Sequence, residues 1–159
     1  MTETMLSFIA QLGGAMALGI AAIGSAIGIG SAGQSAAGAW SKDARAGQGL
    51  RFTYIILLGL PISQTLYGMI VMNKIRKLLT EAPQIALQNA GILLMVGVCV
   101  GVAEMFSAWM QGRIGAAGIR CISDTEGKGF AFLLIAMGIV ETVGIFAMVF
   151  TLGFIPSAG

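Results

Sequence analysis

Four long segments with almost no charge decide what this chain can fold into. Residues 4–41 and 52–73 contain no charged side chain, residues 82–112 contain only Glu104, and residues 130–159 contain only Glu141. A helix needs about 20 apolar residues to cross a bilayer, and it satisfies its own backbone polar groups there. We therefore predict an all-α integral membrane protein with four transmembrane helices, at roughly residues 5–39, 52–73, 85–112 and 130–155.

Composition excludes several classes of protein. The chain is 57% hydrophobic and 10% charged, whereas a soluble domain carries roughly a quarter charged residues. Its formal net charge of +2 is too small to indicate a nucleic-acid partner, and it contains no histidine for imidazole catalysis. No pair of nucleophile and base stands out. We expect a protein that is not an enzyme and that uses no organic cofactor.

Glycine is concentrated in the first segment. Gly28 to Gly33 formally matches G-x-G-x-x-G, but dinucleotide binding by that motif requires a preceding strand and a following soluble helix. In a membrane helix, small residues instead let neighbouring backbones approach closely. We expect the first helix to face a crowded surface, such as the inside of a tight ring, and bulky residues to face lipid.

The two halves of the chain repeat. Ala36-Ala37-Gly38 matches Ala116-Ala117-Gly118 at an offset of 80 residues, which predicts two helical hairpins of parallel topology, residues 1–79 and 80–159.

The polar connections between the spans differ in charge. They are expected at residues 42–51, 74–83 and 113–128. The first and third together carry six Lys or Arg, against three in the second. The positive-inside rule then predicts these two in the cytoplasm and both termini outside.

Glu141 is the strongest candidate functional residue, because an ionisable side chain near the middle of a membrane span is a functional hypothesis by default. The alternative is a structural glutamic acid that is kept neutral by hydrogen bonds. The second span presents Leu60, Ser63, Gln64 and Tyr67 on one helical face. Pro61 should bend that helix and leave carbonyl groups available nearby.

The third span contributes Ser107 and Gln111 on one face, with Gln111 at about the same depth as Glu141. Hard cations bind several oxygen ligands. We expect Glu141 to supply charge, Gln64, Gln111 and Ser63 to supply neutral oxygens, and Tyr67 to hold Glu141. A proton needs fewer partners, so the surplus of oxygens favours Na⁺ over H⁺. Glutamines that only join helices are the alternative.

Glu104 lies two turns before Gln111 on the same face. We expect it to be structural or interior-facing, and protonated or paired. A second ion ligand, a pore-lining group and a residue that reaches the headgroups are the alternatives. Gly138 and Gly144 are expected to thin the fourth helix around Glu141.

Three motifs, in this order along the chain, resemble the V-type ATPase proteolipid, subunit K or c. They are L-P-x-[ST]-Q-x-x-Y at Leu60–Tyr67, F-S-A-x-x-Q-G at Phe106–Gly112 and V-E-T at Val140–Thr142. The chain is similar to the bacterial sodium-translocating branch of that family. The resemblance implies a rotor ring that carries one Na⁺, or alternatively H⁺, per protomer, coupled to ATP hydrolysis or synthesis on other subunits. Implied partners are identical protomers, a stator subunit (a or I), a central-stalk subunit on the cytoplasmic loops, and the lipid bilayer.

The resemblance also implies residue roles. Glu141 would hold the ion, assisted by Gln64, Gln111, Ser63 and the carbonyl of Leu60, while Tyr67 supports the glutamate. Ser63 stands where threonine is more usual. The repeat places Pro61 opposite Glu141, so the first hairpin lacks an equivalent carboxylate and one ion per four helices is implied.

Two other classes remain as alternatives. A small four-helix multidrug or cation transporter would be expected to carry its carboxylate early in the chain, among aromatic residues, but the first span is uncharged and the chain is only 8% aromatic. A structural or pore-forming membrane protein would explain the glycines, but not the set of Glu141, Gln64 and Gln111.

Overall fold

The computed structural model describes residues 1–157, and it contains four long helices, one of which is interrupted. They are α1 (Glu3–Arg45); α2 (Thr53–Gly59), continued by the 3₁₀ turn η1 (Leu60–Ile62) and by α3 (Ser63–Glu81); α5 (Ala90–Asp124); and α6 (Phe130–Leu152). A short helix, α4 (Pro83–Gln88), precedes α5. Residues 1–157 contain no strand, and all four long helices are long and apolar enough to cross a membrane. The predicted all-α, four-span fold is confirmed.

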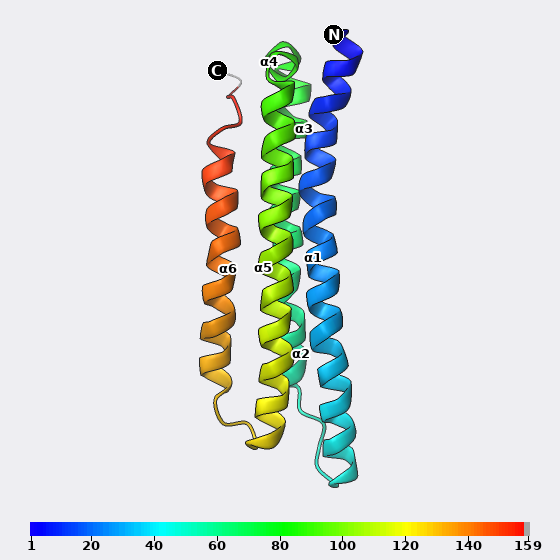
Figure 1. Ribbon diagram of the computed structural model, residues 1–159, viewed down its shortest axis with the longest axis vertical. Helices are drawn as coiled ribbons and strands as arrows, with labels where there is room; N and C mark the ends of the chain where they lie inside the picture. The colour runs from blue at the N-terminus through cyan, green and yellow to red at the C-terminus, as the bar shows by residue number, and fades with distance from the viewer. Residues whose placement is uncertain (158–159) are drawn as a thin grey trace.

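The helices lie side by side along the long axis of the molecule (Figure 1). Both chain ends and α4 lie at one end of the bundle, and the α1–α2 and α5–α6 connections lie at the other. The two predicted hairpins therefore run in parallel, with their tight connections at the same end. Gly47 and Gly127, one in each connection, have φ of +67° and +98°. The repeat of 80 residues therefore extends to the backbone conformation of the turns.

Several polar residues that were predicted in connections are helical instead. Lys42 and Arg45 lie in the last turn of α1, Arg76 lies in α3, and Arg113 and Arg120 lie in α5. Lys and Arg are good helix formers, so a helix can continue after it leaves the hydrocarbon. At 43 residues, α1 is roughly 65 Å long, about twice the thickness of a hydrocarbon core.

The third span begins later than predicted. Pro83 starts the separate helix α4, which ends at Gln88 and is capped by Asn89, where φ is −109° and ψ is 18°. The long helix α5 therefore starts at Ala90 rather than at residue 85. Proline suits a first helical turn because it has no N–H to satisfy there. The predicted hairpin boundary at residues 79 and 80 falls just before the end of α3 and stays a prediction.

Small residues bring α1 and α5 into close contact. A Cβ atom at Gly97 would collide with the backbone of Gly13, and one at Gly112 would collide with the backbone of Gly28. The expectation that the first helix faces a crowded surface is confirmed for this face, and the surface is α5 of the same chain. A Cβ atom would meet nothing within 4 Å at four other glycines of α1: Gly19, Gly30, Gly33 and Gly38. By contrast, α6 exposes bulky side chains such as Phe132, Ile139 and Phe146.

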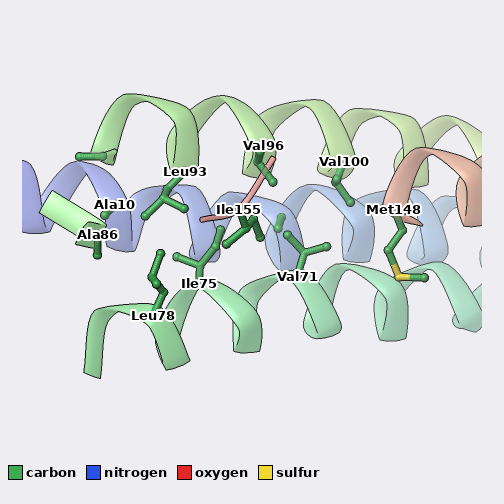
Figure 2. Close-up of a cluster of buried hydrophobic side chains, with 12 residues drawn as sticks. Ala10, Val71, Ile75, Leu78, Ala86, Leu93, Val96, Val100, Met148 and Ile155 are labelled. Carbon is green, nitrogen blue, oxygen red and sulfur yellow. The ribbon is translucent and has the colours of Figure 1, made fainter. Parts of the chain in front are cut away.

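Two apolar clusters fill the bundle. Figure 2 shows the one near the chain ends, where Val71, Ile75, Leu93 and Val96 point into the space between α1, α3 and α5. The second cluster lies toward the tight connections and contains Ala32, Ala36, Ala39, Tyr54, Leu57, Ile119, Ile122 and Met137. Most of the buried polar side chains, such as Gln64, Glu104 and Gln111, lie on the parts of the helices between these two clusters.

Candidate functional site

The candidate site is a polar layer that lies between the two apolar clusters. Gln64, Glu104 and Gln111 are fully buried, and Ser107 is 4% exposed. They come from α3 and α5, and α6 adds Glu141, which is partly buried. Burying polar groups costs free energy unless they are paired, so their hydrogen bonds show how the layer is organised.

The break in the second helix shapes one side of the layer. Pro61 cannot donate a backbone hydrogen bond, and the chain tightens into a 3₁₀ turn over Leu60–Ile62. The hydroxyl of Ser63 then lies 3.0 Å from the carbonyl oxygen of Leu60 and 3.2 Å from Oε1 of Gln64. Three oxygen atoms from a carbonyl, a hydroxyl and an amide therefore gather at the start of α3. The carbonyl of Leu60 also accepts the backbone N–H of Ser63, so the free carbonyl groups expected from Pro61 stay a prediction.

Gln64 joins α3 to α5. Its Nε2 donates to Oγ of Ser107 and to Oε1 of Gln111, both at 3.2 Å. Ser107 in turn donates to the carbonyl oxygen of Val140 on α6 at 3.1 Å. The layer is thus one connected network across three helices, in which each member fixes the orientation of the next.

Glu141 completes the network. The phenol of Tyr67 donates to its Oε1 at 2.8 Å, and Nε2 of Gln111 donates to its Oε2 at 3.3 Å. The same Nε2 also lies 3.3 Å from the carbonyl oxygen of Met137. Both carboxylate oxygens therefore have a donor, one from each neighbouring helix. Hydrogen bonds to a charged acceptor are among the strongest in proteins.

All six residues proposed from the sequence are brought together: Leu60, Ser63, Gln64, Tyr67, Gln111 and Glu141. The matching depth of Gln111 and Glu141 is explained by their direct hydrogen bond. Within residues 1–157, no three His, Cys, Asp or Glu side chains group together. A cation held here would therefore depend on one carboxylate plus amide, hydroxyl and carbonyl oxygens, a donor set of low charge that suits a monovalent ion.

Sequence reasoning missed one member of the network and misplaced one glycine. Ser107 had been noted only as sharing a face with Gln111, yet it links Gln64 to the backbone of α6. Gly144 does not make room for Glu141 as expected, because a Cβ atom there would collide with Oε2 of Glu104. A Cβ atom at Gly138 would meet nothing within 4 Å, so this glycine faces neither carboxylate.

Glu104 is interior-facing as expected, and its complete burial excludes a role in reaching the headgroups.

The end of the bundle with the tight connections carries a second set of polar contacts. Arg51 donates to the carbonyl oxygen of Ile122 at 2.8 Å and lies 3.8 Å from Oδ2 of buried Asp43. Lys42 pairs with Asp124 at 2.6 Å across the two hairpins. These contacts fasten the first connection to α5, so part of the predicted basic surface is occupied within the chain.

Comparison with protein-family models identifies a match that covers most of this chain. A family model described as the C subunit of ATP synthase matches residues 12–73 and 94–153. The first range runs from α1 into α3 and the second covers most of α5 and α6, so each hairpin lies largely within one matched range. A search of curated proteins finds no match.

Proposed function

The chain belongs to the ATP synthase C-subunit family, and on that premise we propose that it is the rotor-ring proteolipid of a V-type rotary ATPase and carries one Na⁺ per protomer on Glu141. Members of this family are non-catalytic, multi-pass membrane proteins that form rings and translocate ions. The V-type assignment is supported by two hairpins in one chain with the ion-site carboxylate on the second only. The three sequence motifs at Leu60–Tyr67, Phe106–Gly112 and Val140–Thr142 support it as well.

The observation that carries the proposal is the hydrogen bonding of Glu141. Tyr67 and Gln111 each donate to one of its oxygens, so the carboxylate is held in one orientation. The oxygens of Ser63, Gln64 and Leu60 lie together at the start of α3, and Gln64 is linked to Glu141 through Gln111. A proton would need only one of these oxygens, whereas Na⁺ needs several to replace its water. The surplus favours Na⁺.

The mechanism follows from the cost of charge in hydrocarbon. With Na⁺ bound, the charge of Glu141 is neutralised and the protomer can turn past lipid. When the site is empty, an ionised Glu141 would be too costly there. Glu141 is partly buried, at the side of the bundle, where a positive group on the stator can draw it away and release the ion. Each ion that crosses contributes about 2.3 kcal/mol per 100 mV, so several ions are needed for each ATP.

Orientation and partners are part of the same proposal. We place the α1–α2 and α5–α6 connections in the cytoplasm and both termini outside, because the basic residues are concentrated at the end with these connections. Arg45, Arg120 and Lys128 are exposed there and are the groups offered to a central-stalk subunit. Exposed small residues of α1 would face the α1 and α5 helices of neighbouring protomers in the ring.

Carbodiimide labelling of the purified ring tests the proposal. Carbodiimides modify protonated carboxyl groups in apolar surroundings, so bound Na⁺ should protect Glu141. We expect Na⁺ at constant ionic strength to protect this residue while K⁺ does not, and Glu141→Gln to abolish both the protectable label and coupled ion transport. If only rising pH protects Glu141, the ring carries protons. If Glu141 never reacts, the site assignment is wrong.

A further inference from the structure

Glu104 is a buried carboxyl group that the ion site does not use. Its side chain has no exposed surface. Neither of its oxygen atoms has a hydrogen-bond partner among residues 1–157. An ionised carboxylate in that position would lack any compensating donor, in a segment that lies within the membrane. Such a charge is strongly unfavourable there, so the group must bind something that cancels its charge.

The space around Glu104 limits what that ligand can be. Gly144 on α6 faces it, and a side chain at that position would overlap the carboxyl group. A Cβ atom at residue 144 would also lie 3.2 Å from Oγ of Ser107, whose hydroxyl is already bonded to Gln64 and to the carbonyl of Val140. A metal cation needs several free oxygens, and Oγ of Ser107, the oxygen that lies beside Gly144 together with the Glu104 carboxyl group, is already engaged. A proton needs only the carboxyl group.

The neighbouring charged groups favour the same ligand. Glu141 on α6 is the other charged residue of the membrane-spanning segments, because residues 52–73 contain none and residues 82–112 contain only Glu104 itself. No charged side chain comes from the membrane-spanning part of α1, because residues 4–41 contain none. The membrane-spanning segments therefore offer Glu104 a second carboxyl group but no cationic side chain, so a negative charge on it has nothing to balance it.

We propose that Glu104 is a second, proton-binding site in each protomer, and that it stays protonated while Glu141 binds and releases the transported ion. Glu141 is partly exposed, whereas Glu104 has no exposed surface and its carboxyl group packs against Gly144. The transported load therefore remains one cation per protomer although two carboxyl groups lie within the membrane. This inference goes beyond the proposed function and does not depend on whether the transported ion is Na⁺ or H⁺.

Infrared spectroscopy of the intact ring at neutral pH, with and without saturating Na⁺, tests the proposal. A protonated carboxyl group in apolar surroundings gives a carbonyl stretch that is distinct from the bands of carboxylates. We expect one such band per protomer to persist in saturating Na⁺ and to be lost in Glu104→Gln. In Glu141→Gln that band should remain. Na⁺ should bind at one equivalent per protomer in both the wild type and Glu104→Gln.

Two glycine variants provide a matched pair that keeps every carboxyl group. Gly144→Ala should displace Glu104 and shift its band, whereas Gly138→Ala, which meets nothing within 4 Å, should leave the band unchanged. The absence of the band in Na⁺-saturated wild-type ring, its survival in Glu104→Gln, or a second bound Na⁺ that depends on Glu104 would each overturn the proposal. A band from Glu141 that Na⁺ does not remove would instead count against the sodium assignment and leave Glu104 unaffected.

Discussion

The hydrogen bond from Tyr67 to Glu141 gives the sharpest quantitative prediction. The phenol donates to Oε1 at 2.8 Å, and Tyr67→Phe removes only that donor while it keeps the ring. A hydrogen bond to a charged group contributes about 1.5–3 kcal/mol, and about 1.4 kcal/mol corresponds to a tenfold change in an equilibrium constant. If the bond is made in the ion-loaded state and not after Glu141 has been drawn away, the variant should weaken Na⁺ binding about 10-fold to 150-fold.

The assay is the Na⁺ concentration that half-protects Glu141 from carbodiimide in the purified ring. Tyr54→Phe is the matched control, because Tyr54 is fully buried in α2 and its hydroxyl has no hydrogen-bond partner among residues 1–157. The control should leave the half-protecting concentration within about twofold, since no bond to a charged group is lost. An equal shift in the two variants, or no shift in Tyr67→Phe, would refute the role given to Tyr67.

Two further predictions concern stability. Gly97→Ala should force α1 and α5 apart by roughly 1 Å, because carbon atoms pack at about 3.5–4.0 Å, and the strain should cost about 1–3 kcal/mol. Thermal dissociation of the ring in detergent measures this loss of stability. Gly91→Ala is the control, because a methyl group there meets nothing within 4 Å. If both variants dissociate at the same temperature, the close contact is not what holds these helices together. Arg51→Ala should destabilise the protein by about 1.5–3 kcal/mol, because it removes a donor to a buried carbonyl and the cation beside buried Asp43. Arg45 is exposed, so Arg45→Ala should change the dissociation temperature of the ring little. Equal dissociation temperatures for the two arginine variants would show that Arg51 does not fasten the first connection.

Hydropathy and helical periodicity were enough to predict the four spans, the shared end of the two tight connections, and the residues that meet in the candidate site. The apolar segments are long and their interruptions are polar, so the number of helices follows from the cost of exposing charge or free backbone groups to lipid. The spacing of Leu60, Ser63, Gln64 and Tyr67 places them on one face whatever the helix packs against. The family match supports the same general function.

The helix ends were predicted less well, because hydropathy marks where hydrocarbon contact ends and not where a helix ends. α1 continues through Lys42 to Arg45, since its last turns need only water or loop partners outside the membrane. Pro83 starts a new helix instead of simply ending a loop. Neither outcome changes the number of membrane crossings.

The sequence by itself determined that a carboxyl group, two glutamines, a serine and a tyrosine lie at one depth within four membrane helices. Only the tertiary structure decided which of their atoms meet. Periodicity fixes the face that a residue occupies on its own helix, but the rotation of one helix against the next depends on packing. Here, the contact of Gly13 with Gly97 and of Gly28 with Gly112 sets α1 against α5. The remaining packing turns Ser107 toward Gln64. It also turns Gly144 toward Glu104, rather than toward Glu141, which lies three residues earlier in the same helix.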